Sequence, residues 1–153
     1  MSVAVALATR YLLVMLFFPF SALDKIINFR GAVGQARELV PAAEPATALI
    51  VAGLAVEILM PLGVLTGIAD RLAAFVLAGY CVVTALLWKR WWMPGDFWHA
   101  GESKARALFW DFLKNFSLAG GFLLLAFGLH AGDADAFATD PFGSSHPYAA
   151  RAQ

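Results

Sequence analysis

The sequence predicts an all-α integral membrane protein, a four-helix bundle with a short interfacial helix between helices 1 and 2. Of the 153 residues, 61% are hydrophobic and only 14% are charged. The mean hydropathy of +0.71 is well above that of soluble domains of this size. Four apolar stretches also approach the roughly 20 residues that a helix needs to cross a bilayer. These spans fill most of the chain and leave no room for a separate soluble domain.

The four predicted spans cover about residues 3–23, 45–67, 72–88 and 109–131. The first stretch could be confused with a secretory signal, but its apolar run is too long and it lacks an early basic cluster, so we expect a retained helix. Residues 1–131 then form a single domain of four transmembrane helices. Residues 132–153 are polar and contain Asp and Pro, so we expect a tail that is mobile or held by a partner.

The connection after the first span has a helical pattern. Apolar residues recur there at steps of three and four: Ile26, Phe29, Val33, Ala36 and Val40. This spacing predicts a short helix that lies in the membrane interface. Gly31 and Gly34 weaken the pattern, and a solvated loop is the alternative.

The distribution of positive charge predicts the orientation. The first and third connections carry seven Lys and Arg residues: Lys25, Arg30, Arg37, Lys89, Arg90, Lys104 and Arg106. The side with the termini carries only Arg71 and Arg151. By the positive-inside rule, the connections face the cytoplasm and both termini face outward. All five tryptophans flank the third connection, as expected for an aromatic belt at the membrane interface.

Ionisable side chains within a span cost roughly 2.5–3.5 kcal/mol each at the helix centre, so each needs a partner or a wet cavity. Five polar residues in the predicted spans form the candidate intramembrane site: Arg10, Glu57, Asp111, Lys114 and Asn115. Glu57 lies near the middle of the second span. Pro61, four residues later, has no N–H to donate to the Glu57 carbonyl.

Depth along the helices leaves the pairing of these residues open. A long Arg10 side chain could reach Glu57 from the first span, whose polar residues share one face. Lys114 could reach Glu57 or extend outward instead. The residues could serve as interhelical ion pairs that fix the register of the helices. Alternatively, they could line a cavity that binds a quinone head group or passes a proton, with Glu57 as the titrating group.

Other signals mainly exclude functions. Zero formal net charge argues against nucleic-acid binding. Cys81 is the only cysteine, which excludes a dithiol relay within the chain. No spaced cluster of residues predicts a metal site, and the three histidines, His99, His130 and His146, are too scattered for haem ligation. Gly63 and Gly67 form a GxxxG pair, which suits helix packing within the bundle or, as the alternative, homo-oligomer formation.

Several motifs together resemble the DoxX family of small bacterial membrane proteins, over about residues 7–130. They are Arg10, Ser21-Ala22-Leu23-Asp24-Lys25, Glu57-Ile58-Leu59, Gly63-Val64-Leu65-Thr66-Gly67, Arg71-Leu72-Ala73-Ala74 and the distinctive Lys114-Asn115-Phe116-Ser117-Leu118-Ala119-Gly120-Gly121. The resemblance implies a four-helix bundle in the bacterial inner membrane, which would place the termini in the periplasm. Some similar proteins are subunits of a thiosulfate:quinone oxidoreductase, and others are linked to membrane oxidoreductase complexes that handle sulfur or oxidative stress. The resemblance assigns no catalytic residue.

The leading hypothesis is therefore a membrane subunit of a quinone-linked oxidoreductase assembly, which supplies a quinone site or a docking platform. A partner subunit would carry the redox centres, because such chemistry belongs mainly to cofactors and this chain has no evident ligands for haem, iron–sulfur clusters or metals. The competing hypothesis is a structural or assembly protein with no site of its own. A small transporter or proton pathway is less favoured, because the proline in the second span has no symmetry-related counterpart. Whether the chain is itself an enzyme stays open.

Overall fold

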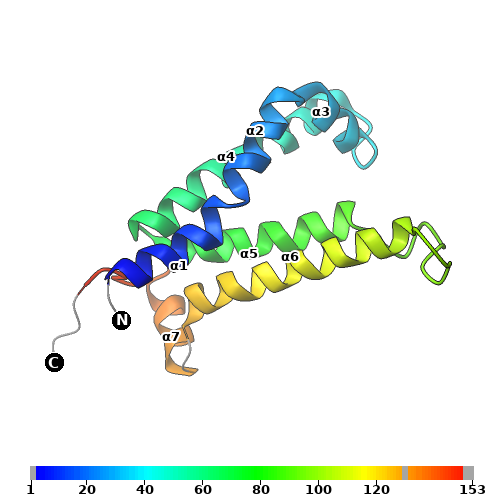
Figure 1. The fold of residues 1–153 in the computed structure, drawn as a ribbon. Helices are drawn as coiled ribbons and strands as arrows, with labels where there is room; N and C mark the ends of the chain where they lie inside the picture. Colours follow the sequence, from blue (N-terminus) through cyan, green and yellow to red (C-terminus); the bar gives the residue numbers. More distant parts are fainter. Residues whose placement is uncertain (1–2, 129–130, 150–153) are drawn as a thin grey trace.

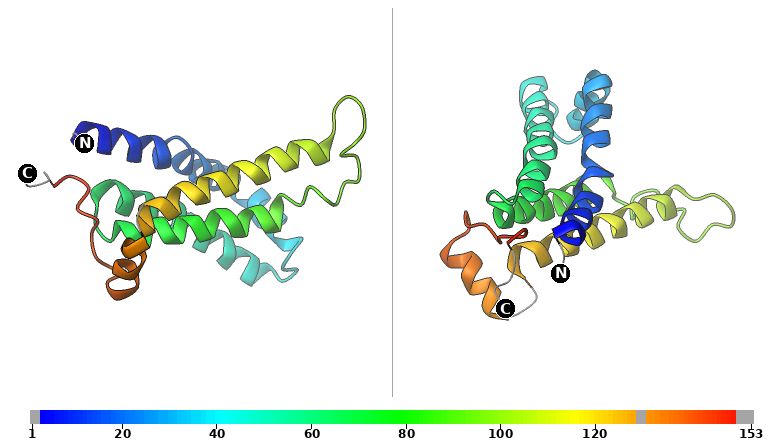
Figure 2. Two further views of the ribbon diagram at one scale, coloured as in Figure 1. Left: turned by 90° about the horizontal axis from the view of Figure 1, so that it is seen from below. Right: turned by 60° about the vertical axis from the view of Figure 1, so that its left-hand side comes forward.

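The computed structural model describes residues 3–128 and 131–149, and within them the chain forms seven helices and no strand. In chain order these are α1 (Val3–Met15), α2 (Phe18–Ile27), α3 (Phe29–Arg37), α4 (Ala43–Thr66), α5 (Asp70–Trp88), α6 (Lys104–Phe127) and α7 (Ala131–Thr139). Figure 1 shows two arms that diverge from the α4–α5 turn. One arm consists of α2, α3 and α4, and the other of α5 and α6. The right-hand view of Figure 2 shows the same divergence.

Four helical segments of the described residues are long and apolar enough to cross a membrane: Val3–Ile27, Ala43–Thr66, Asp70–Trp88 and Lys104–Phe127. This confirms the predicted all-α architecture with four spans. The connection after the first span contains the predicted short helix, α3. Ala36 of α3 is buried against Ala46 and Ile50 of α4, so the apolar stripe found in the sequence packs on the next span.

The first span is broken into α1 and α2, a break that hydropathy does not reveal. Pro19 occupies one of the first two positions of α2, where its missing N–H removes one helical hydrogen bond and its ring disfavours a continuous helix. The N–H of Ser21 bonds to the carbonyl of Phe17 at 2.9 Å, so helical bonding resumes within one turn. The break separates the polar residues of α1 from those of α2.

The turn between α4 and α5 depends on two glycines. Gly67 ends α4 with φ 77°, a left-handed conformation that glycine adopts without strain. A Cβ atom on Gly63 would lie 2.9 Å from the Cβ of Ala73, so glycine is needed there for α4 and α5 to pack closely. The GxxxG pair is therefore used within the bundle.

The main hydrophobic core lies where the two arms meet. It contains Val14 and Phe18 from the first span, Val64 from α4, Leu77 from α5 and Phe122 from α6. These large side chains come from all four spans, and their van der Waals packing holds this end of the bundle together, since lipid is as apolar as the side chains themselves.

The third connection is folded against the start of α6. The side chain of Ser103 accepts a hydrogen bond from the N–H of Arg106 at 3.1 Å, which makes Ser103 the N-cap. The carboxylate of Asp96 accepts bonds from the N–H groups of Lys104 and Ala105 at 2.7 and 2.9 Å. The helix consequently begins at Lys104, five residues before the predicted span, because polar caps rather than hydropathy set its start.

Part of the tail, which the sequence predicted to be mobile or held by a partner, packs on the bundle. The ring of Phe137 on α7 lies 5.4 Å from that of Phe75 on α5 and 5.2 Å from that of Phe127 on α6. Residues 144–148 then reach the end of α4. The segment is polar on average, so its composition does not reveal that these few residues contact the bundle. Residues 150–153 of the tail lie outside the described residues, as does His130.

Candidate functional site

A cavity of about 520 Å³ lies between the two arms of the structure. Its walls come from α2, α3 and α4 on one side and from α5 and α6 on the other. Apolar side chains form much of the lining, among them Phe17, Leu49, Val56, Val83 and Leu87. The polar lining residues gather around Glu57 and towards the first and third connections. Apolar walls with a few convergent polar groups are typical of small-molecule sites.

Glu57 is the centre of the polar contacts in this cavity. Its side-chain oxygen Oε1 accepts hydrogen bonds from the hydroxyls of Ser21 and Tyr80, each at 2.8 Å. The Nζ of Lys25 forms an ion pair with the same oxygen at 2.8 Å and also donates to the Ser21 hydroxyl at 2.7 Å. Three donors from two helices therefore converge on one oxygen of α4. Ser21 and Lys25 lie four residues apart on α2, which places them on one helix face.

The second oxygen of the same carboxylate has no hydrogen-bond partner among the described residues. Oε2 of Glu57 is buried and accepts no hydrogen bond, while the residue as a whole is only 2% exposed. Buried polar atoms in native proteins nearly always have a partner, because an unmade bond costs about 1–3 kcal/mol or more for a charged group. All the hydrogen bonds that Glu57 makes to the described residues therefore converge on Oε1, and Oε2 is closed to solvent.

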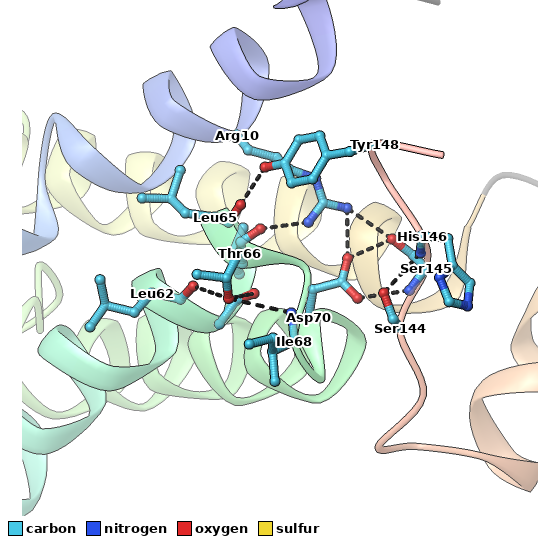
Figure 3. A network of polar contacts seen from close by, with 12 residues as sticks. Arg10, Leu62, Leu65, Thr66, Ile68, Asp70, Ser144, Ser145, His146 and Tyr148 are labelled. Carbon is cyan, nitrogen blue, oxygen red and sulfur yellow. Dashed lines mark hydrogen bonds and ion pairs between the residues drawn. The ribbon is translucent and has the colours of Figure 1, made fainter. Parts of the chain in front are cut away.

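A second buried ion pair lies at the C-terminal end of α4. The Nη2 atom of Arg10 on α1 is 2.7 Å from Oδ2 of Asp70 at the start of α5, and the two side chains are only 7% and 1% exposed. Figure 3 shows both side chains pointing towards each other, with Ser145 beside them. The Ser145 hydroxyl accepts a bond from Arg10 at 2.9 Å and donates to Asp70 at 2.5 Å. The N–H of Ser145 adds a third bond to Asp70 at 2.8 Å.

The same cluster caps the end of α4. The last carbonyl groups of a helix lack partners within the helix. Here Nη1 of Arg10 donates to the carbonyl of Val64 at 2.6 Å, and the Tyr148 hydroxyl donates to the carbonyl of Leu65. A Cβ on Gly67 would lie 3.0 Å from the ring of Pro147, so the tail also depends on the glycine at this turn. The cluster joins α1, α4, α5 and the tail.

Comparison with known families identifies the family of the chain. A family model described as DoxX matches residues 5–90, which is 86 of the 153 residues. The chain belongs to the DoxX family. Searches among curated proteins and among solved structures found no match.

The family match covers one polar cluster of this DoxX protein completely and the other only in part. Ser21, Lys25, Glu57 and Tyr80 all lie within the matched residues, so the complete Glu57 cluster falls in the family region. Arg10 and Asp70 also lie within it, whereas their tail partners do not. The Lys114-Asn115 segment, which seemed the most distinctive part of the resemblance, lies outside the matched range.

The other predicted residues of the DoxX chain form a third, more exposed group on α6. Asp111 pairs with Lys89 at 3.0 Å and with Lys114 at 3.5 Å. The Lys114 side chain is 75% exposed, so it extends outward and does not reach Glu57. Asn115 lines the cavity and donates from Nδ2 to the carbonyl of Asp111 at 2.8 Å.

The residues of the predicted site therefore lie in three separate places in the structure. Arg10 does not meet Glu57: its partner is Asp70, and the partner of Glu57 is Lys25. Matching depths along two helices could not identify these pairs, because depth does not fix the direction in which each helix face points. Sequence reasoning missed Asp70 because it lies in a short polar break, and it missed Tyr80 because a tyrosine in an apolar helix gives no distinct signal.

No metal centre is apparent at these clusters. Within residues 3–128 and 131–149, no group of three or more His, Cys, Asp or Glu side chains is placed to hold a metal ion. Cys81 lines the cavity and is buried on α5. The chemistry that the cavity supports on its own residues is hydrogen bonding around Glu57.

Proposed function

We propose that this DoxX protein is the membrane subunit of a quinone-linked oxidoreductase assembly and that the Glu57 cavity holds the quinone head group. The observation that carries the proposal is a mostly apolar cavity of about 520 Å³ with the Ser21, Lys25, Glu57 and Tyr80 cluster in its wall. This volume lies within the range of about 300–1,000 Å³ that small-molecule pockets occupy. A quinone combines an apolar ring and tail with oxygens at two edges, which suits such a lining.

Electron transfer in this proposal depends on a partner subunit. Organic redox reactions take place mainly on cofactors, so the partner carries the redox centres and the DoxX bundle contributes the membrane site. The cavity extends from Glu57 towards Gln35 and Lys89 near the first and third connections. We place these connections on the cytoplasmic side of the bacterial inner membrane and the termini in the periplasm, because the connections carry the excess of Lys and Arg. The partner then docks on the cytoplasmic face.

Photoaffinity labelling tests the cavity. The full chain in detergent would be labelled with an azido-benzoquinone that carries a short alkyl tail, and the modified peptides mapped by mass spectrometry. We expect labels on α2, α4 and α5 that an excess of decyl-benzoquinone prevents. Labels spread over the lipid-facing surfaces and insensitive to competition would refute a quinone site.

A pair of glycine variants supplies the control. Gly53 lines the cavity, and Gly53→Leu should fill part of it and abolish competed labelling. Gly79 is exposed on α5, with no atom within 4 Å of a Cβ built there, so Gly79→Leu should leave labelling unchanged. Equal loss in both variants would indicate a general effect on folding.

Native mass spectrometry tests the assembly. The protein would be released from its own membranes in mild detergent, and every protein and small molecule that accompanies it identified. A co-released redox subunit together with a quinone supports the proposal. A monomer or homo-oligomer that carries only lipid would favour the structural role.

The structural role has its own supporting observation, the Arg10–Asp70 cluster. Its charged groups pair with each other, bond to Ser145 and cap α4, so they need no ligand to explain them. A purely structural protein should lose stability when Arg10 is replaced, and Gly53→Leu should then leave quinone-dependent turnover of the native complex unchanged. Loss of turnover in folded Gly53→Leu would count against this alternative.

A further inference from the structure

The turn between α4 and α5, from which the two arms diverge, contains strained backbone. Gly67 has φ 77° and Ala69 has φ 48°. Glycine adopts the left-handed conformation without strain, but a residue with a Cβ atom does so only at a cost in free energy. Such a residue persists where the surrounding structure holds it in place. The turn therefore needs support from outside itself.

Residues 144–148 of the tail supply this support, because they bond to both helices that flank the turn. On the α5 side, the N–H and the hydroxyl of Ser145 both donate to the side chain of Asp70, the first residue of α5. On the α4 side, the Tyr148 hydroxyl donates to the carbonyl of Leu65. Figure 3 shows these bonds on either side of the turn. The tail thus links the end of α4 to the start of α5.

The tail is also anchored to one arm before it reaches the turn. The ring of Phe137 on α7 packs on Phe75 of α5 and on Phe127 of α6, both in the α5–α6 arm. The bond from Tyr148 to Leu65 then connects this anchored segment to α4, which belongs to the other arm. A segment that is fixed to one arm and bonded to the other resists rotation of the arms about the turn.

We propose that residues 144–148 form a strap that fixes the angle between the two arms and thereby the width of the cavity between them. The inference goes beyond the proposed quinone site, since it holds whatever ligand the cavity binds. The cavity walls come from both arms, so a change in the angle changes the separation of the walls. The Glu57–Tyr80 bond also joins the arms, but it lies only about 15 Å along α4 from Gly67. Towards the open end, where the arms separate (Figure 2), their spacing depends most on the turn.

A small rotation at the turn becomes a large displacement at the far end of the arms. Glu44 lies 23 residues before Gly67, which is about 34 Å along α4 at about 1.5 Å per residue. A rotation of about 10° about the turn therefore moves Glu44 by about 6 Å. Arg10 still bonds to the Val64 carbonyl and to Asp70 when the strap is released, so we expect the chain to stay folded.

Double electron–electron resonance on the full chain in detergent measures the angle. Spin labels on Glu44→Cys and Glu102→Cys report the distance between the ends of the two arms, because both positions are exposed and Cys81→Ala removes the native cysteine. The strap is released by Ser145→Ala together with Tyr148→Phe. We expect the distance distribution to shift or broaden by at least about 5 Å. A change below about 2 Å, which corresponds to a rotation below about 3°, would overturn the inference.

Two controls separate the strap from a general loss of structure. Ser144→Ala removes a hydroxyl that accepts a bond from the N–H of His146 within the tail, so it should leave the distance between the arm ends unchanged. Labels on Glu102→Cys and on Leu124→Cys, an exposed position of α6, both belong to the α5–α6 arm, and their distance should not respond to release of the strap. Equal changes in both label pairs would indicate general loosening and overturn the inference. If the double variant fails to fold, Tyr148→Phe alone, which keeps the ring, decides by the same distances.

Discussion

Replacement of Arg10 by methionine should destabilise the bundle strongly, although Arg10 lies outside the cavity. Methionine keeps an apolar side chain of similar length but removes the charge and the donors. Asp70 would then remain as a buried carboxylate, 1% exposed, without its cation. Its bonds from the Ser145 N–H and hydroxyl remain and reduce the cost.

The size of the effect follows from these contacts. Removing one partner of a buried ion pair costs about 3–5 kcal/mol, and the remaining Ser145 donors place the expected loss near the lower value. The lost bond from Arg10 to the Val64 carbonyl adds about 1 kcal/mol. For chains of about this length each kcal/mol lowers the Tm by about 2–4 °C. We therefore expect the Tm to fall by about 8–16 °C.

Thermal unfolding in detergent, followed by tryptophan fluorescence, measures this loss. The double variant Arg10→Met with Asp70→Asn removes both charges and should recover at least about 1.5 kcal/mol relative to the sum of the single variants. Asp111→Asn, on the exposed α6 pair, should change the Tm little because exposed pairs contribute about 0–1 kcal/mol. A Tm change below about 3 °C in Arg10→Met, or strict additivity in the double variant, would refute the argument.

Three further predictions test other contacts of the fold. Ser145→Ala removes the hydroxyl that donates to Asp70 at the start of α5, and Tyr148→Phe removes the donor to the Leu65 carbonyl near the end of α4. Each change should cost about 1 kcal/mol in thermal unfolding. Ser144→Ala should cost less, because the Ser144 hydroxyl accepts a bond from the nearby N–H of His146. Gly63→Ala places a Cβ 2.9 Å from that of Ala73 and should lower stability by about 1–3 kcal/mol, whereas Gly79→Ala, with nothing within 4 Å, should be neutral or slightly stabilising. The backbone N–H groups of Ala105 and Lys104 lower the pKa of Asp96 below its ordinary value, so this cap stabilises the start of α6 above about pH 4 and is lost as the pH falls through the lowered pKa. Hydrogen exchange should show the protection of the Lys104 and Ala105 amides falling in acid for the native chain, and Asp96→Asn should not show this change.

The architecture could be predicted because it depends on average properties of long segments. Hydropathy identified the four spans, and the apolar stripe around Phe29 and Val33 identified α3. The details that the sequence did not predict depend on single backbone groups. Pro19 breaks the first span, and Ser103 with Asp96 starts α6 before the apolar run. Neither effect changes the mean hydropathy of its segment.

The polar clusters were predicted less well than the spans, for a geometric reason. The sequence identified Arg10 and Glu57 as buried charges that need partners, but a partner is chosen by helix rotation and by contacts between distant segments. Lys25 reaches Glu57 from the C-terminal end of α2, and Asp70 meets Arg10 from what looked like a connecting turn. Ser145 comes from a segment whose composition resembles that of a flexible tail. No local sequence pattern indicates these contacts.

The Arg10–Asp70–Ser145 contacts also have a consequence for biosynthesis. Arg10 is synthesised well before Ser145, which lies 135 positions later. Chains fold during synthesis from the N-terminal side, so Asp70 must wait for two of its hydrogen-bond donors until Ser145, 75 positions later, has been made. C-terminal truncations chosen to simplify expression would remove part of the polar core, and a fusion tag needs a linker that leaves residues 144–148 free to dock.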